Sequence, residues 1–344
     1  KDKSQDYSSS HSPLFLKNSC DLKNIVASKG VINDKKIVKL LTFHFDQMDE
    51  NIIDYIKTCV FTYLIINKVY QLNRDIKKYF NCQDSNKAIK KYLNYFNNSI
   101  IKSYLDPRTD YCTLSSLEKL CTNIKKDLII LNQSINEIIN YNDLPSELKN
   151  QILIASGIEI CPYCGRQFIT RYKDKSSADI DHFFPKKFLP LLSLSLYNFI
   201  PSCQICNSRF KNQHIKKILY PFDDSYKNNA MFKVKYLSPI TDIHPEIEIQ
   251  IENISKDKSF ETNEDIKLFH IDEIYQSHNK FISDLIYRDH IYNNPAYKQS
   301  IKGLLPSHLS DEQMNILLFG YSLDLEKDEK KPLGKLVNDI LNTL

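Results

Sequence analysis

The chain has 344 residues, of which 42% are hydrophobic and 26% are charged. These proportions are ordinary for a soluble globular protein, and the length allows two or three domains. The sequence also excludes a membrane-spanning protein, because no apolar run approaches the roughly 20 residues that a transmembrane helix needs. The net charge of +4 is too small to identify a nucleic-acid partner by itself.

The N-terminal part of the chain is polar at first and then helical in pattern. Residues 1–13 are rich in Ser, Asp and Lys, so we expect them to be disordered. They lack the apolar region of a secretion signal, which predicts a cytoplasmic protein. A helical domain is predicted over 14–156, with helices near 35–47, 50–80, 86–105 and 146–156.

The clearest amphipathic pattern lies near the end of this domain. Its candidate N-cap is Thr113 or Ser115, and Asn142, Asp143 and Pro145 break the pattern. Apolar residues recur between these limits in steps of three and four, which predicts a core-packing face of a helical bundle. The stripe consists of Leu117, Leu120, Cys121, Ile124, Leu128, Leu131, Ile135, Ile138 and Ile139.

The C-terminal part reads as a strand pair followed by helices. Residues 231–237 and 246–253 alternate apolar with polar residues, which is typical of strands. Ser310 and Gln313 form a capping-box pattern at the start of a helix. Helices are predicted near 270–290, 310–320 and 332–344.

These patterns predict a mainly α fold with a small α+β insert. Gly157 ends the helical N-terminal domain, and a motif-rich segment follows over 157–224. The last predicted region, 225–344, combines a β-hairpin with helices. Because 157–224 interrupts the helical pattern and carries most of the unusual residues, we expect the functional site there.

Four of the nine cysteines form two Cys-x-x-Cys pairs, Cys161 with Cys164 and Cys203 with Cys206. A two-residue gap lets both sulfurs of a pair reach one ion, so the pairs predict a closed, structural Zn²⁺ site. The 38 residues between the pairs exceed the gap of about 15 to 20 in simple zinc ribbons, so a folded insert must lie there. The scattered cysteines are expected to be buried free thiols: Cys20, Cys59, Cys82, Cys112 and Cys121.

The insert between the pairs contains Asp179-Ile180-Asp181-His182. As a strand, this run directs Asp179 and Asp181 to one face and Ile180 and His182 to the other, and Pro185 ends it. A neutral imidazole suits the deprotonation of water, while carboxylate and amide oxygens suit a hard ion such as Mg²⁺. These residue types predict metal-assisted hydrolysis of a phosphodiester.

Positive charge is concentrated around this motif. Residues 161–217 contain ten Lys and Arg against three Asp, which makes +7 for the segment and −3 for the rest of the chain. Such an excess is the footprint expected of a surface that contacts a phosphate backbone, although a Lys-rich chain also has basic segments by chance. The candidate nucleic-acid contacts are Lys186, Lys187, Arg209 and Lys211.

The motifs together resemble those of an HNH endonuclease of the ββα-metal type. The resemblance rests on Asp-x-Asp-His, on Asn198 in Tyr-Asn-Phe-Ile-Pro, and on Cys-x-x-Cys-Asn with Lys211 four residues later. It implies a zinc-stapled ββα-metal domain that hydrolyses nucleic acid, DNA above all, with catalytic Mg²⁺ or Mn²⁺ and structural Zn²⁺. It also implies that the metal-binding helix begins around the second cysteine pair and that Lys211 contacts the phosphate.

The same resemblance implies a role for each motif residue. His182 is the general base, and Asp181 and Asn207 ligate the catalytic ion with Asp179 in support. Asn198 braces the loop that positions His182. Each residue alone has a plainer reading, as a strand end, a turn former or a polar helix residue. Their combination in family order within about 50 residues is what favours a nuclease.

A more specific resemblance covers roughly residues 150–344. The runs that carry it are Asp-His-Phe-Phe-Pro-Lys, Leu-Ser-Leu-Tyr-Asn-Phe-Ile-Pro-Ser-Cys, Tyr-Pro-Phe-Asp (220–223) and Lys-Pro-Leu-Gly-Lys-Leu (331–336). They are similar to the HNH subunits of bacterial antiphage systems such as Septu and certain retrons. The resemblance implies an effector nuclease that works with an ABC/SMC-like ATPase subunit, and the N-terminal helices are candidates for holding that partner.

Two other interpretations remain open. In the first, the chain is a zinc-organised subunit that binds nucleic acid or serves as a scaffold and has no catalytic activity. In the second, it is the nuclease subunit of a complex and is inactive without its partner. Binding without divalent metal and without products would indicate the first, and activity that appears on adding an ATPase would indicate the second. His182 and a candidate ligand pair favour the nuclease, because a pure binder needs neither.

Overall fold

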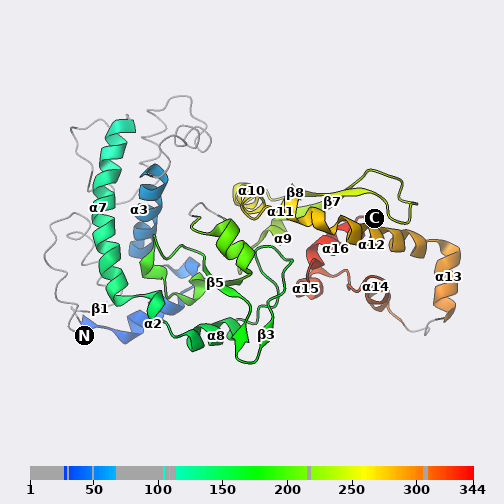
Figure 1. The fold of residues 1–344 in the computed structure, drawn as a ribbon, viewed down its shortest axis with the longest axis horizontal. Helices are drawn as coiled ribbons and strands as arrows, with labels where there is room; N and C mark the ends of the chain where they lie inside the picture. The colour runs from blue at the N-terminus through cyan, green and yellow to red at the C-terminus, as the bar shows by residue number, and fades with distance from the viewer. Residues whose placement is uncertain are drawn as a thin grey trace. The chain divides into compact units, whose positions relative to one another are not determined.

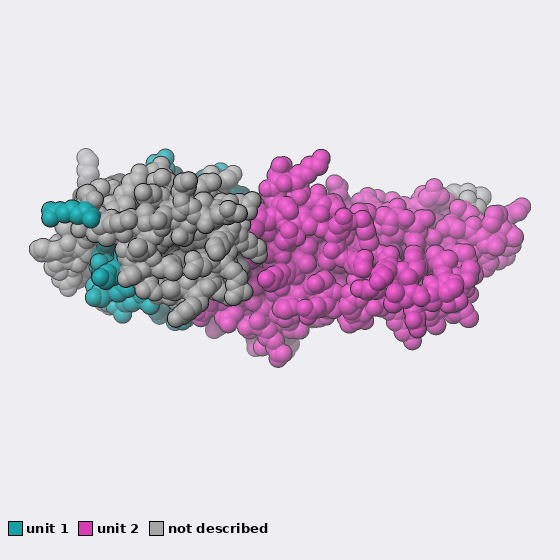
Figure 2. Space-filling view, turned by 90° about the horizontal axis from the view of Figure 1, so that it is seen from above, with its two compact units in different colours: residues 1–144, 184–199 teal, residues 145–183, 200–344 magenta. Residues whose placement is uncertain are grey.

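The chain forms two compact units, which Figure 2 colours teal and magenta. The first comprises Lys1–Leu144 with Phe184–Phe199, and the second comprises Pro145–Phe183 with Ile200–Leu344. This division follows the contacts between residues. It does not test the predicted domain limits, which stay predictions. The computed structural model describes residues 27–28, 31–48, 50–66, 104, 108, 114–214, 218–304 and 309–344.

Some predictions therefore lie outside the described residues. They concern the disordered start over 1–13, the part of the helix near 50–80 that follows residue 66, almost all of the helix near 86–105, the N-cap Thr113, and Cys20, Cys82 and Cys112. Cys59 and Cys121 are described, and both are buried free thiols as predicted. Within the described residues, no helix combines the length and the apolar character that crossing a bilayer requires.

The first unit is built on two long helices that lie side by side, α3 (Glu50–Ile66) and α7 (Leu114–Ile138) (Figure 1). The buried residues of α7 confirm the predicted stripe and are Leu120, Cys121, Ile124, Leu128, Leu131 and Ile135. The shorter elements of the unit are β1 (Ala27–Ser28), β2 (Val31–Ile32), α2 (Asp34–Thr42), η3 (Phe45–Gln47), η4 (Tyr141–Asp143), η5 (Pro190–Leu192) and η6 (Leu196–Asn198). Of these, η5 contacts α7 and η6 contacts α2.

The second unit has one extended core around a β-hairpin. Strands β7 (Ala230–Tyr236) and β8 (Ile247–Asn253) pair antiparallel, with Phe232 opposite Ile251 and Val234 opposite Ile249. Their apolar residues alternate with polar ones, so one face is buried while the other carries Lys and Glu. Helix α16 (Gly334–Leu341) packs on β7, and α10 (Ser259–Leu268) and α12 (Asn279–Tyr292) contact β8 (Figure 1).

Both predicted C-terminal strands are confirmed, and so is the capping box. Ser310 Oγ accepts from the Gln313 N–H at 3.2 Å, and Gln313 Oε1 accepts from the Ser310 N–H at 2.9 Å. The remaining helices are α9 (Tyr226–Asn229), α11 (Ile271–Ile274), η8 (Tyr275–His278), α13 (Pro295–Leu304), α14 (Asp311–Phe319) and α15 (Leu325–Asp328). Together the described elements make a mainly α protein in which the strands form small antiparallel pairs.

The motif segment contributes short elements to the second unit. Helix α8 (Ser146–Ala155) leads into it and contacts β4 (Lys175–Ser176), which pairs with β3 (Arg171–Tyr172). The predicted strand over 179–182 is confirmed as β5 (Asp179–His182), which pairs with β6 (Phe199–Ser202). Helix η7 (Ile205–Lys211), a π-helix that contacts β5, begins within the second cysteine pair and contains Cys206. The two segments that carry the motif residues therefore lie against each other.

Candidate functional site

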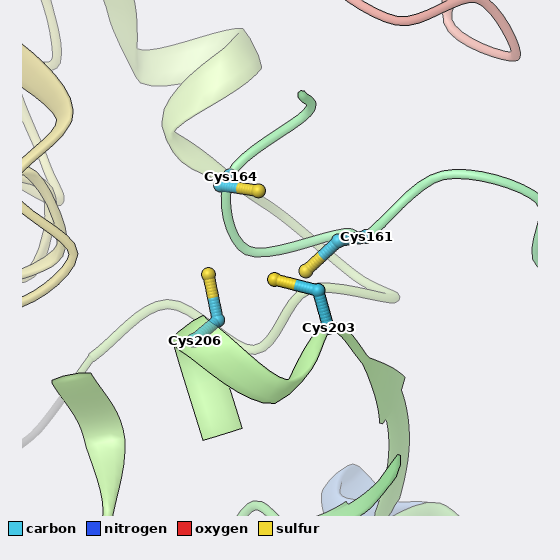
Figure 3. Close-up of side chains that lie close together, drawn as sticks. All are labelled: Cys161, Cys164, Cys203 and Cys206. Atoms are coloured by element: carbon cyan, nitrogen blue, oxygen red, sulfur yellow. The ribbon is translucent and has the colours of Figure 1, made fainter. Parts of the chain in front are cut away.

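The four paired cysteines come together from the two ends of the motif segment (Figure 3). Cys161, Cys164, Cys203 and Cys206 are free thiols whose Sγ atoms all lie within 4.8 Å of one another. Three of the side chains are buried and Cys203 is partly exposed. Four thiolates around Zn²⁺ at about 2.3 Å place the sulfurs about 3.8 Å apart, so this cluster needs only a small contraction. The cysteines could therefore hold a metal ion such as zinc.

The first cysteine pair sits in a tight turn that the sequence encodes with a glycine. The Gly165 N–H donates to the Cys161 oxygen at 2.8 Å, and the Cys161 N–H donates to the Gln167 oxygen at 2.9 Å. Gly165 has φ +62°, a conformation that favours glycine. A Cβ at this position would lie 2.8 Å from the Tyr226 hydroxyl oxygen. The turn therefore needs glycine for both its backbone angle and its close packing.

The surroundings of the four thiols shift their pKa values in different directions. Burial raises the pKa of Cys161, whereas hydrogen bonds with Cys161, Cys203 and Cys206 lower the pKa of Cys164. A bound Zn²⁺ takes all four as thiolates, so binding must release the remaining protons. An ion held by all four thiolates would have no open coordination position, which is the arrangement typical of a structural rather than a catalytic zinc.

Two pairs of side chains join β5 to η7. Asn207 Nδ2 donates to Asp179 Oδ2 at 3.2 Å, and Lys211 Nζ lies 2.9 Å from Asp181 Oδ2. Asp179 and Asp181 are two residues apart on the strand, and Asn207 and Lys211 are four residues apart on the helix, so each pair lies on one side of its element. Asp179 and Asp181 thus face the same neighbour, as their alternation predicts. The partly buried Ile180 packs instead against Leu153, Ile169 and Ala178.

Asp181 and Lys211 form a buried ion pair. They are 2% and 1% exposed, and Lys211 Nζ also donates to the His182 carbonyl oxygen at 2.6 Å. The Tyr163 hydroxyl donates to Asp181 Oδ2 at 2.6 Å. Burial lowers the pKa of Lys211 against the opposing effect of Asp181, and burial together with the Asp181 charge raises the pKa of Tyr163. Lys211 therefore fixes both the carboxylate of Asp181 and the main chain of His182.

Tyr163 is a site residue that the sequence analysis did not single out. It occupies the third position of the first Cys-x-x-Cys pair, is 3% exposed and stacks on Phe269 with ring centroids 4.5 Å apart. An aromatic residue between two metal ligands carries no signal of its own in one sequence. Its contact with Asp181 links the cysteine cluster to the Asp-x-Asp-His strand.

Asn198 closes the loop that leaves β5 and returns to β6. Its Oδ1 accepts from the Phe184 N–H at 2.6 Å, and its Nδ2 donates to the carbonyl oxygens of Phe184 and Leu192 at 3.0 and 2.9 Å. The side chain is fully buried. Phe184 follows His182 by two residues in the chain. These bonds connect Asn198 to Phe184 and Leu192 within the loop, and its role in positioning His182 stays a prediction.

The predicted nucleic-acid contacts differ in exposure. Arg209 lies on the exposed side of η7, and Lys186 and Lys187 are exposed in the first unit, where Lys186 Nζ lies 4.0 Å from the Tyr141 ring centroid. Lys211, by contrast, is buried with Asp181 and His182. The contact of Lys211 with phosphate stays a prediction. In the structure its ammonium group is hydrogen-bonded to Asp181 and to the His182 carbonyl oxygen.

A hard divalent ion at Asp181 and Asn207 is a different case from zinc. Lys211 contacts both oxygens of Asp181, and Tyr163 bonds to one of them. Asn207 binds Asp179 through its amide nitrogen, so its amide oxygen is the candidate ligand. Over the described ranges, the cysteine cluster is the one group of at least three His, Cys, Asp and Glu with ligand atoms this close. A Mg²⁺ site here requires Lys211 to share or release the carboxylate.

The chain was compared with known proteins in three ways. No family model matches it, no curated protein is similar to it, and no solved structure resembles its fold. The fold and site define a mainly α protein with a cluster of four cysteines that could hold a metal ion. Any closer identity rests on the motifs and their geometry.

Proposed function

We propose that the protein is a metal-dependent HNH endonuclease that hydrolyses nucleic-acid phosphodiester bonds, with DNA as the favoured substrate. The observation that carries this proposal is the pair of contacts from η7 to β5, Asn207 with Asp179 and Lys211 with Asp181. These residues come from two motifs separated by more than 20 positions. Their side chains have no reason to meet in a simple zinc ribbon, whereas a ββα-metal site requires a strand and a helix to present them together.

In this proposal His182 takes a proton from the attacking water, whose oxygen forms a bond to phosphorus as the bond to the leaving oxygen breaks. Asp181 and Asn207, with Asp179 in support, would hold a Mg²⁺ or Mn²⁺ ion, which would neutralise charge at the phosphate. Lys211 is a positioning residue, since it holds the His182 carbonyl oxygen and the Asp181 carboxylate at once. Asn198 keeps the following loop in place.

We further propose an effector role in bacterial antiphage defence together with an ABC/SMC-like ATPase subunit. This part rests on the sequence resemblance over roughly 150–344. The C-terminal Lys-Pro-Leu-Gly-Lys-Leu run supports the second unit structurally, because the Leu333 N–H donates to the Gly165 oxygen at 2.9 Å beside the cysteine cluster. The similarity of that ending is therefore compatible with a shared fold requirement as well as a shared partner.

The experiment that tests the proposal incubates zinc-loaded protein with plasmid, single-stranded DNA and total RNA. Each reaction is run with Mg²⁺, with Mn²⁺ and without added divalent ion, and each is repeated with a candidate ATPase subunit and ATP. We expect products that depend on Mg²⁺ or Mn²⁺. Binding without products under every condition would instead indicate the non-catalytic nucleic-acid-binding subunit, and products only with the ATPase would indicate a nuclease arm that is silent alone.

A further inference from the structure

The hairpin of β3 and β4 projects from the second unit directly before the Asp-x-Asp-His strand. Arg171 pairs with Ser176 and Tyr172 pairs with Lys175, so that Lys173 and Asp174 form a two-residue turn. Every residue from 170 to 175 is exposed. The strand β4 ends at Ser176 and β5 begins at Asp179. Anything bound by the hairpin is therefore one short step along the chain from the candidate site.

The base of the hairpin is fixed to the core of its unit. Ile169 and Ala178 are buried in a cluster with Leu153 of α8. The Ser177 N–H donates to the Thr170 oxygen at 2.9 Å, and the Thr170 N–H donates to Ser177 Oγ at 2.8 Å. The exposed tip thus stands on an anchored base, which makes it an ordered element rather than a loose loop.

The three positive charges of this hairpin outnumber its one negative charge, Asp174 in the turn, whereas the lysines of the other hairpin in the same unit are paired with glutamates. On β7 and β8, Lys233 pairs with Glu252, and Lys235 lies 3.5 Å from Glu248. On β3 and β4 the residues opposite each other are Arg with Ser and Tyr with Lys. Within the part of the chain that the structure describes, no ion pair involves the side chains Arg171, Lys173 and Lys175. Unpaired cations on an exposed tip are the arrangement that binds phosphate.

Exposed aromatic rings accompany these charges. Tyr172 is 53% exposed and Phe168, just before β3, is 65% exposed. Large apolar rings in water carry a hydrophobic cost, and a stacked base removes it while leaving the tyrosine hydroxyl in solvent. Cations with an interleaved aromatic are the combination found on proteins that bind single-stranded nucleic acid.

The turn keeps a lysine where glycine is easier to accommodate. Lys173 has φ +52°, in the left-handed region that costs a non-glycine residue about 1 kcal/mol. A glycine would adopt this conformation without the cost and would lose the charge. The presence of lysine at this position therefore gives a direct way to separate folding from binding.

We propose that the β3–β4 hairpin binds the nucleic-acid strand beside the cut, with Arg171, Lys173 and Lys175 on phosphates and Tyr172 stacked on an unpaired base. It follows that the preferred ligand has a single-stranded stretch at the site. The cleavage of that ligand rests on the proposed function, but its binding by the hairpin does not.

The test measures binding to a labelled single-stranded oligonucleotide and to its duplex, by fluorescence anisotropy, with full-length zinc-loaded protein and no added Mg²⁺. The triple variant Arg171→Gln/Lys173→Gly/Lys175→Gln is expected to bind the single strand at least tenfold more weakly. Its slope of log affinity against log salt should fall by about 2, because each lost phosphate contact removes about 0.7. The control Lys233→Gln/Lys235→Gln, whose lysines are already paired with Glu, should bind as the wild type does.

Two single variants test the roles separately. Lys173→Gly should weaken binding while the unfolding midpoint stays the same or rises. Tyr172→Ala should lower single-strand affinity about fivefold or more with a smaller effect on the duplex, whereas Tyr172→Phe should retain the affinity. Unchanged affinity and salt slope in the triple variant, or equal losses in the control, would overturn the proposal.

Cleavage assayed in parallel distinguishes the two proposals. Hairpin variants that bind and cut normally would contradict the hairpin proposal and leave the proposed nuclease function unaffected. Wild-type protein that binds through the hairpin and never cuts would support the hairpin proposal and contradict the proposed nuclease function. Wild-type protein that binds neither oligonucleotide would contradict the hairpin proposal outright.

Discussion

At the scale of single residues, the buried pair of Asp181 and Lys211 is the most consequential arrangement. Each charge is compensated mainly by the other, with Tyr163 and the His182 carbonyl oxygen completing the hydrogen bonds. Burying two charges is costly, and replacing one partner leaves the other uncompensated. The pair is best explained by what it holds in place, namely the main chain at His182.

Replacing Lys211 by Met should therefore destabilise the protein by about 3–5 kcal/mol, because it leaves the Asp181 carboxylate buried and unpaired. The double variant Lys211→Met/Asp181→Asn should recover part of this loss. Urea unfolding measures both changes. Lys327→Met, at an exposed pair with Glu312, is the control and should change little. A loss for Lys211→Met as small as the control's would show that the pair does not hold the site together.

Several site residues were predictable singly, but their partners were not. The alternation of Asp179 and Asp181 and the pairing of the cysteines follow from period and spacing, which act over short stretches of chain. The contact of Lys211 with Asp181 spans 30 residues, and that of Tyr163 with Asp181 spans 18. Such contacts depend on how the strand and the helix pack, which a single sequence does not specify.

At the scale of elements, η7 is a π-helix that begins within the second cysteine pair and carries Asn207 and Lys211. The Asn212 N–H donates to the Asn207 oxygen at 2.8 Å, a bond across five residues that defines a π-helical turn. Asn212 has φ +45°, which ends the helix. Asn207 and Lys211 thereby face β5 together. Wider turns of this kind are rare and occur frequently at functional sites.

Helix α16 begins with the tightest glycine in the described part of the chain, Gly334. A Cβ on Gly334 would lie 2.0 Å from the Asp328 carbonyl oxygen. The Asp328 side chain in turn accepts from the N–H groups of Ser322 and Leu323 and from Asn338 Nδ2. The C-terminal run of the chain is therefore packed backbone against backbone, with no space for a side chain.

Gly334→Ala should accordingly destabilise the protein by about 3 kcal/mol or more, because the clash is with main chain rather than with a flexible side chain. Gly303→Ala is the matched control. Gly303 lies inside α13 with no atom within 4 Å of an added Cβ, so alanine there should stabilise by about 0.5–1 kcal/mol. Chemical denaturation of the two variants gives the comparison, and equal effects would contradict the packing described.

Most elements with a clear apolar period were predicted, whereas helices α10 and α13 were missed. The stripe of α7, the strands β7 and β8 and the capping box of α14 all appear where the pattern indicated. Helix α10 was not predicted. Its buried residues include Thr262, Glu264 and Asp265, so its inward face is polar and leaves no hydrophobic period in the sequence.

At the scale of the whole molecule, the cysteine cluster belongs to the main core of the second unit. Cys161, Cys164 and Cys206 share one hydrophobic cluster with residues as distant as Leu341. The hydroxyl groups of Tyr226 and Tyr275 both donate to the Cys164 oxygen, at 3.0 and 2.7 Å. The cysteine cluster and the C-terminal helices are therefore parts of one core.

Removing the metal should lower the stability of this whole core rather than of one loop. We expect one zinc per chain by elemental analysis, and a large fall in the thermal unfolding midpoint after treatment with a strong chelator, because structural zinc contributes directly to folding. Re-addition of Zn²⁺ should restore the midpoint. Protein that is purified without zinc, and whose midpoint does not respond to chelator or to added Zn²⁺, would show that the four thiols serve another purpose.

The central claim is that His182 activates water for phosphodiester hydrolysis, and the most direct measurement is the cleavage rate of His182→Ala under single-turnover conditions. The account predicts a loss of at least about 100-fold, with wild-type zinc content and with the variant still folded by circular dichroism at the assay temperature. His244→Ala, a partly exposed histidine paired with Asp284 outside the motif, should cut at the wild-type rate. Cleavage by His182→Ala at the wild-type rate, on the substrate that the wild-type protein cuts, would contradict the account.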